Sequence, residues 1–431
     1  MRRRFMNIST EGLAGLVLGC LISTPAGAQA PLRLPDLERM AIENHPAIAQ
    51  AQASVRAAEG RTMQAGLYPN PTIGVGGDEN SPGPIIRGGE FGGFIEQRIV
   101  TGGKLRLDRE AARHQQSRAA QMAGADRQRV LNRVRAHFYE TLGAARVVEV
   151  RGELARLAAR ALETSRELAN VGQADRPDVL ASEIEAQRAE VGLAMANNTF
   201  QRAWRQLAAA AGRPEMVLAP IEGDLAAAPK LDLDRELETL FDKSPELGVA
   251  RALVEEGDAA LRRARVEKIP DIQVRGGVRY NRELLERDLK PVGVEGFFDV
   301  GIRIPLFDRN QGAVAAARAE LERARREQDR VKLSLRSRLA SAWQEYQDQS
   351  LLADRYRDEL LPRTRQSHEL YQKSFRQMAA AYPQVLIAQR NLFQMEEQYA
   401  QALVGVWLSA VEIQGLLLAE SRAVKLSLTG E

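Results

Sequence analysis

The stretch FFDVGIRIPLFDRNQG, residues 297–312, joins a strand pattern directly to the start of a helical segment. Its apolar positions are Phe298, Val300, Ile302 and Ile304. The positions between them are Asp299, Gly301 and Arg303. Alternation of this kind predicts a strand with one apolar and one polar face. The turn-forming DRNQG that follows, and the Ala/Glu/Arg-rich segment after it, predict that this strand leads into a long helix.

The overall composition favours an elongated helical protein. The chain has 431 residues, with 27% charged and only 5% aromatic side chains, which suits long surface-rich helices better than a thick globular core. Lys and Arg (60) nearly balance Asp and Glu (57), so the sequence gives no case for nucleic-acid binding.

The N-terminus has the pattern of an export signal. Three arginines precede an apolar run from Leu13 to Ile22, and a small-residue cleavage motif ends at Ala28. We therefore expect residues 1–28 to be removed. The alternative is a lipoprotein-type cleavage before Cys20, the sole cysteine, which would then carry a lipid. Neither reading leaves a disulfide framework. No later stretch of about 18 apolar residues predicts a membrane-spanning helix.

The remaining sequence contains an internal repeat. NHPAIAQAQ (44–52) is echoed by KSPELGVAR (243–251), and the same offset of 199 aligns Pro71 with Pro270. Further on, an offset of 206 aligns RPDVL (176–180) with YPQVL (382–386). The expected organisation is a first repeat at 29–213, a Pro-containing linker at 214–232, a second repeat at 233–422 and a tail at 423–431.

Each repeat is expected to run helix, two strands, long helix, turn, long helix. The first helix should break at Pro46, and the strand pairs should lie at about 72–100 and about 271–305. No proline occurs between Lys104 and Arg176, which predicts a helix of about 100 Å. In the second repeat Pro362 should kink or break the corresponding helix.

The strands cannot form a closed sheet within one chain. Each second-half strand is about ten residues long and has one apolar and one charged face, as in a membrane barrel. An open sheet edge in lipid would leave backbone groups unpaired, and the smallest barrels have about eight strands. We therefore expect several copies to share one barrel. The expected lipid-facing residues are Ile272, Val274, Val278, Phe298, Val300 and Ile302. The expected lumen-facing residues are Arg98, Arg275, Arg279, Asp299 and Arg303.

Together with three sequence motifs, the internal repeat resembles a known protein family over essentially the whole mature chain. The motifs EQRIVTGGK (96–104), IRIPLFDRNQG (302–312) and GQADRPDVL (172–180) resemble those of TolC-type outer membrane efflux proteins. PLFDRNQG and TGGK are most similar to the cobalt-zinc-cadmium resistance branch. The resemblance implies a mainly α fold with a four-stranded β contribution. It also implies a homotrimer with a 12-stranded outer membrane β-barrel and a tunnel of helices in the periplasm of a Gram-negative bacterium.

The same resemblance implies partners and assigns the two interhelix turns. The partners are a periplasmic adaptor protein, an inner-membrane RND-type pump and outer membrane lipid. The turns would form the periplasmic tip that meets the adaptor and closes the resting channel. The tip residues are Gly172, Pro177, Asp178, Val179, Leu180, Pro383, Val385 and Leu386. Relatives narrow the pore with acidic residues near the second turn, but here Glu369 is the sole acid in 364–378. Glu369 is a gate candidate, with Asp175 and Asp178 as rivals.

The sequence contains no motif that is typical of an enzyme active site. The histidines are His45, His114, His137 and His368, and they form no HExxH pair. No nucleophile elbow, P-loop or dinucleotide fingerprint is present, so we expect neither an enzyme nor a resident metal or cofactor. The expected function is passive export of divalent heavy-metal cations. Multidrug efflux, type I secretion of polypeptides and a periplasmic coiled-coil adaptor are the alternatives.

Overall fold

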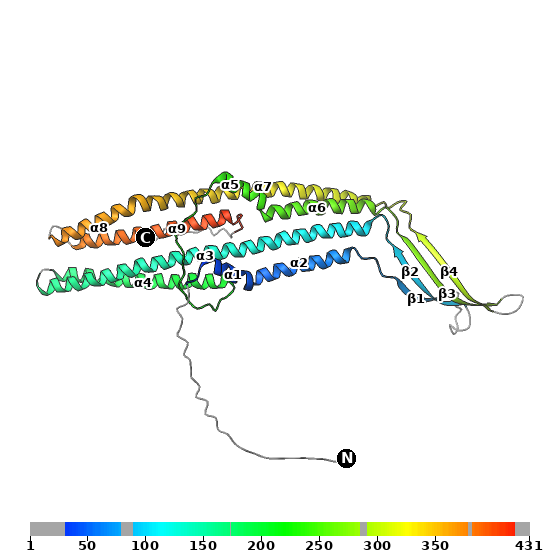
Figure 1. The fold of residues 1–431 in the computed structure, drawn as a ribbon, viewed down its shortest axis with the longest axis horizontal. Coiled ribbons are helices and arrows are strands. Elements are labelled where there is room, and N and C mark those ends of the chain that lie inside the picture. Colours follow the sequence, from blue (N-terminus) through cyan, green and yellow to red (C-terminus); the bar gives the residue numbers. More distant parts are fainter. Residues whose placement is uncertain (1–30, 79–88, 173, 285–290, 378–381, 419–431) are drawn as a thin grey trace, which may run out of the picture.

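The computed structural model describes residues 31–78, 89–172, 174–284, 291–377 and 382–418. The predicted signal segment, Cys20 and the tail at 423–431 lie outside these residues. The molecule is elongated, with a four-stranded sheet at one end and long helices extending from it to the other end (Figure 1). None of the described helices combines the length and the apolar run that a membrane crossing requires.

Each half of the chain starts with two consecutive helices, and the second helix of each pair begins at a proline. The helices are α1 (Leu34–Asn44) and α2 (Pro46–Ala65), then α5 (Leu233–Lys243) and α6 (Pro245–Val266). Proline suits a first helical position because its missing N–H would be unpaired there anyway. The residue before each proline caps the helix, since the His45 ring accepts from Ala47 N–H and Ser244 Oγ from Leu247 N–H. The break predicted at Pro46 is confirmed.

The sheet combines strands from both halves. Its strands are β1 (Thr72–Asp78), β2 (Glu90–Ile99), β3 (Ile272–Leu284) and β4 (Pro291–Ile302), antiparallel in the order β1-β2-β3-β4. The central β2–β3 pairing runs from Glu90 opposite Asn281 to Ile99 opposite Ile272. Within the described part of the chain, β1 and β4 each have one edge without a partner strand.

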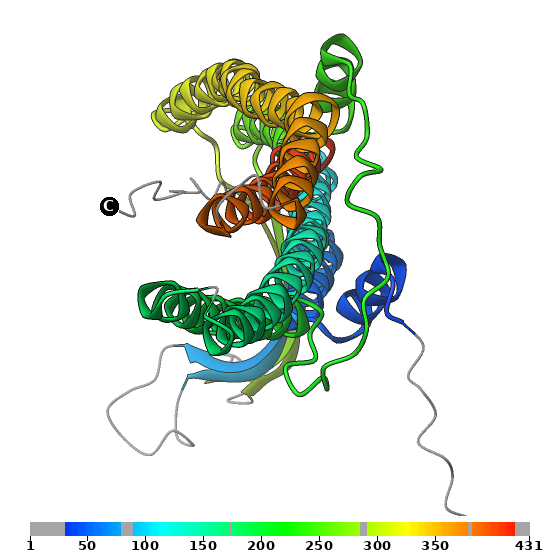
Figure 2. The same ribbon diagram turned by 90° about the vertical axis from the view of Figure 1, so that its left-hand side faces the viewer.

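Long helices make up the rest. They are α3 (Lys104–Asn170), α4 (Arg176–Ala210), α7 (Gln311–Arg355), α8 (Leu361–Arg376) and α9 (Tyr382–Gln414). With 67 residues, α3 is about 100 Å long. Viewed along the long axis, the helices form a curved layer, and α1, α5 and the linker between the halves lie on its convex side (Figure 2).

The interruption predicted at Pro362 takes the form of one π-turn. Tyr356–Leu360 adopt π-helical geometry between α7 and α8, and Leu361 N–H donates to the Tyr356 carbonyl five residues earlier. Proline has no N–H to donate to the carbonyl of residue 358, so the helix cannot keep its regular hydrogen-bond ladder here. The helix therefore continues with a local widening instead of ending.

The core is concentrated where α1, α5 and the linker pack on the long helices. Leu37, Val134 and Leu207 are fully buried in one cluster, and Leu247 and Leu335 anchor a second. Stacking of Tyr139 on Trp407, with centroids 3.9 Å apart, links α3 to α9, and Trp407 also donates to the Leu225 carbonyl of the linker. These contacts fix the two halves side by side.

Candidate functional site

One face of the sheet is apolar and exposed. The register places Ile73 opposite Ile95, Val274 opposite Val300, and Ile272 opposite Ile302. Phe298 is 70% exposed and Val278 is 61% exposed, although both are large apolar side chains in regular strands. Further exposed members of this face are Val75, Phe91, Ile99, Tyr280 and Val294. All six residues expected to face lipid share this face.

The opposite face is polar, and two of its arginines make contacts within the sheet. The Arg275 guanidinium lies 3.9 Å from the centroid of the Phe94 ring. Arg279 pairs with Glu90 on β2 and lies 3.4 Å from Glu295 on β4. Asp299 is opposite Arg275 in the register, and Arg98 is opposite Gln273. Four of the five expected lumen residues therefore share one face, and the contacts of Arg275 with Phe94 and of Arg279 with Glu90 and Glu295 were not predicted from the sequence.

Arg303 is the exception. The strand was expected to continue to about residue 305, but β4 ends at Ile302, which pairs with Ile272, the first residue of β3. Residue 303 therefore has no partner residue on β3. Its side chain is exposed in the segment that leads to α7, so its assignment to the strand was wrong.

A compact charged cluster ties the sheet to the long helices. Lys104, the first residue of α3, is only 3% exposed, and its Nζ lies 2.9 Å from Asp271 Oδ1. Asp271 also accepts from Arg98 Nε at 3.0 Å and from Thr101 N–H at 3.1 Å. Burial alone would raise the pKa of Asp271, but these donors and the two cations together lower it below its ordinary value.

Sequence reasoning missed this cluster. Lys104 is the last residue of TGGK, and Asp271 follows the Pro270 that the internal repeat identifies. Both motifs were found, but they are 167 residues apart, and nothing in the sequence indicates that they meet.

Both long helices after the sheet begin at a residue with left-handed backbone geometry. Gly103 (φ 69°) precedes α3, and Asn310 (φ 63°) precedes α7. Asparagine is among the few non-glycine residues that tolerate this region. Its side chain here donates to the Ala264 carbonyl of α6 at 2.9 Å. DRNQG thus sets the direction in which α7 leaves the sheet.

The two interhelix turns lie at the end of the molecule opposite the sheet (Figure 1). Gly172 has a φ of 73° just after α3, and Pro177 lies in the first turn of α4, as predicted. Val385 in α9 is 6% exposed, whereas Leu180 in α4 is 47% exposed. Val179 and Leu386 are half-buried, and Asp178 is exposed. Pro383 lies in the first turn of α9, and its side chain is outside the described set.

The three gate candidates lie on two different helices. Glu369 lies on α8, while Asp175 and Asp178 lie at the start of α4; all are exposed. The neighbouring His368 is half-buried and interacts with Gln372 at 3.2 Å, and burial lowers its pKa.

The histidines serve local contacts. His114 lies 3.1 Å from Glu255 and links α3 to α6, while His137 lies 2.8 Å from Glu140 on its own helix. Among the residues that the structure describes, no group of three or more His, Cys, Asp or Glu side chains is arranged to hold a metal ion.

Comparison with known proteins agrees with this geometry. A family model described as "outer membrane efflux protein" matches residues 37–213 and again 237–415. The chain is 26% identical over 397 residues to the cobalt-zinc-cadmium resistance protein CzcC of Cupriavidus metallidurans, covering 91% of each protein.

Solved structures share the fold at low identity. The outer membrane protein VceC of Vibrio cholerae aligns with a TM-score of 0.71 at 17% identity, over 89% of this chain and 96% of VceC. CusC aligns with a TM-score of 0.75 at 16% identity, over 89% and 91% of the two chains. With its family model matched once in each half, the chain belongs to the outer membrane efflux protein family.

Proposed function

We propose that three copies of this chain assemble into one export channel, to which each contributes four strands of a 12-stranded barrel. The observation that carries the proposal is the sheet itself. It has an exposed apolar face, a polar face, and two strand edges that lack partners in the described chain. In a membrane these edges need partners, and the β1 edge of one copy can pair with the β4 edge of the next.

The assembled barrel would cross the outer membrane. Its apolar face, including Ile272, Val278 and Phe298, would contact lipid. Arg275 and Arg279 would line the lumen, held in place by the ring and carboxylate contacts described above. Because Arg279 is paired with Glu90 and Glu295, it would contribute less positive potential to the barrel interior than an unpaired arginine.

The helices would continue the pore into the periplasm. The curved layer that they form in one copy is the shape of a wall segment, and three such layers would enclose a tunnel with α1 and α5 outside (Figure 2). The turns near Gly172 and Pro383 would form the far tip, where a periplasmic adaptor docks and links the channel to an inner-membrane RND-type pump. Glu369, Asp175 and Asp178 are the proposed gate residues at this end.

Divalent heavy-metal cations are the proposed cargo. The likeness to a cobalt-zinc-cadmium resistance protein along 91% of the chain supports this choice. A conduit should hold its cargo weakly, which agrees with the lack of clustered metal ligands among the described residues. Export of organic drugs, or of a polypeptide in a type I system, remains the second candidate for the same channel.

Two measurements test the proposal. Purified protein in planar bilayers should give discrete channel conductance, and a protein that never conducts would contradict the channel. A strain lacking the chain should lose tolerance to cobalt, zinc or cadmium and regain it with a plasmid copy. Unchanged metal tolerance together with lost drug tolerance would instead favour the second cargo.

A further inference from the structure

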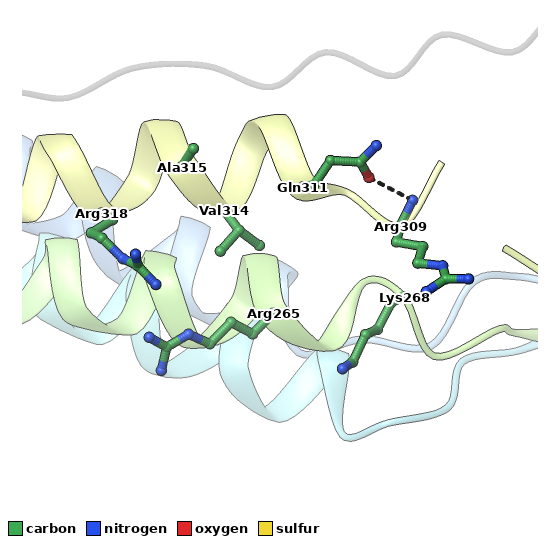
Figure 3. A pocket seen from close by; sticks show the side chains of 7 residues that line it. All are labelled: Arg265, Lys268, Arg309, Gln311, Val314, Ala315 and Arg318. Carbon is green, nitrogen blue, oxygen red and sulfur yellow. Dashed lines mark hydrogen bonds between the residues drawn. The ribbon is translucent and has the colours of Figure 1, made fainter. Parts of the chain in front are cut away.

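Four cationic side chains, all of them exposed, line one open surface cavity close to the sheet. Arg265 and Lys268 lie at and just beyond the end of α6, Arg309 precedes α7, and Arg318 lies on α7 (Figure 3). The cavity has a volume of about 530 Å³, and its remaining lining residues are Gln311, Val314 and Ala315. No carboxylate is among the lining residues, so the cavity is strongly positive.

The positive charge of the cavity is not neutralised by the described residues. Neighbouring arginines on α6 are paired: Arg262 lies 2.8 Å from Glu110, and Arg263 lies 2.6 Å from Asp108. Across the described ranges, no ion pair involves any of the four cavity cations. The cavity also adjoins the N-terminus of the 45-residue helix α7, whose free N–H groups favour an anion. An anionic ligand is the complement of this site.

Helix periodicity indicates on which side of the curved helix layer the cavity opens. Buried Leu321, Leu335 and Ala342 of α7 are spaced by multiples of seven, so residues a whole number of heptads apart share one side. Arg318 is thus on the side of Tyr346, four heptads later, whose hydroxyl donates to the Pro229 carbonyl of the linker. The linker lies on the convex side of the helix layer, so the cavity opens outward (Figure 2).

The neighbouring strands determine where the cavity lies relative to the membrane. Lys268 is four residues before the start of β3, and Arg309 is seven residues after the end of β4. If the sheet spans the outer membrane, as the proposed function requires, the cavity lies at the headgroup level of the periplasmic leaflet. Outward opening excludes the lumen as the source of its ligand.

We propose that this pocket binds the phosphate of an anionic phospholipid headgroup from the periplasmic leaflet. The guanidinium groups of Arg265 and Arg318 lie near each other and can each offer two parallel N–H donors to phosphate oxygens, while Arg309 and Lys268 add positive charge at the other end of the cavity (Figure 3). The offset of 199 places Gly66 and Pro69 where the second half has Arg265 and Lys268, so the first half lacks the equivalent pair. Each copy therefore carries one such site.

The test uses the full-length protein in neutral detergent and compares two variants of equal charge change. Arg265→Gln with Arg318→Gln removes two pocket cations. Arg325→Gln with Arg326→Gln is the control, because these residues are as exposed as the two pocket arginines but lie about two turns beyond the cavity on α7. Binding of fluorescent phosphatidylglycerol and phosphatidylcholine is titrated for each protein, with inorganic phosphate as competitor.

We expect wild type and control to prefer phosphatidylglycerol by about tenfold, and the pocket variant to lose that preference. Equal preference for phosphatidylglycerol in all three proteins would overturn the proposal. Displacement of the lipid by inorganic phosphate at equal concentration would also overturn it and would identify free phosphate as the ligand. Failure of wild type to bind either probe would also overturn it. Conductance is measured on the same preparations, so loss of the channel itself is distinguished from loss of lipid binding.

Discussion

Phe297 and Phe298 are adjacent in the chain but lie on opposite faces of the sheet. The register pairs Phe297 with Gly277 and Phe298 with Gly276. The Phe297 ring is 5.7 Å from the Arg275 guanidinium on the polar face, whereas Phe298 is 70% exposed on the apolar face. Two identical neighbouring side chains thus have opposite surroundings, which provides a matched pair for testing the membrane assignment.

Phe298→Glu should impair assembly in the outer membrane, whereas Phe297→Glu should be tolerated. A carboxylate on the lipid face costs up to about 2 kcal/mol per chain, while at position 297 it would face Arg275 and Arg279. The measurement is the amount of heat-modifiable assembled protein in outer membrane fractions. Equal yields for the two variants would contradict the assignment of faces.

Lys104→Met should destabilise the junction between sheet and helices. It leaves Asp271 without its nearest cation, at a cost of about 1–3 kcal/mol. The double variant with Asp271→Asn should recover part of the loss, because the carboxylate that loses its nearest cation is then replaced by a neutral amide. Melting temperatures of the purified protein report the effect. Lys332→Met is the control: its pair with Asp329 is exposed at 4.0 Å, and its removal should change little.

Acid should weaken the same junction. The folded-state pKa of Asp271 is lowered, so its contribution to stability is present above its unfolded-state pKa and is lost as pH falls through the folded value. Wild-type melting temperature should therefore drop more steeply below about pH 4 than that of Asp271→Asn. Parallel acid profiles for the two proteins would show that Asp271 does not carry this dependence.

Asn310→Val should be more damaging than Asn310→Gly. Glycine keeps the φ of 63° and loses only the hydrogen bond to Ala264, about 0.5–1.5 kcal/mol. Valine loses that bond and also disfavours left-handed geometry by about 1–2 kcal/mol more. Thermal melting should rank wild type, glycine and valine variants in that order. A valine variant as stable as the glycine variant would show that this backbone geometry is not required.

Local patterns in the sequence predicted the elements well, because each depends on nearby residues. Alternation from Phe298 to Ile302 predicted β4, and Pro46 predicted the break between the first two helices. The repeat offset predicted that both halves share one plan. These features follow from backbone geometry and the two side-chain periods.

Contacts between distant segments could not be predicted. The central β2–β3 pairing, the Lys104–Asp271 contact and the packing of Arg275 on Phe94 each join residues from different halves. Strand alternation shows which residues share a face, but it does not show which of them touch. The end of β4 at Ile302 was missed because it depends on where β3 begins, not on the alternation itself, which continues to Ile304.

The central claim is that copies of the chain share one barrel, and the mass of the assembly tests it most directly. Native mass spectrometry of detergent-purified protein should show three copies in one particle, resistant to dilution because β1 and β4 edges are paired between copies. A monomer that retains its secondary structure under the same conditions would contradict the account.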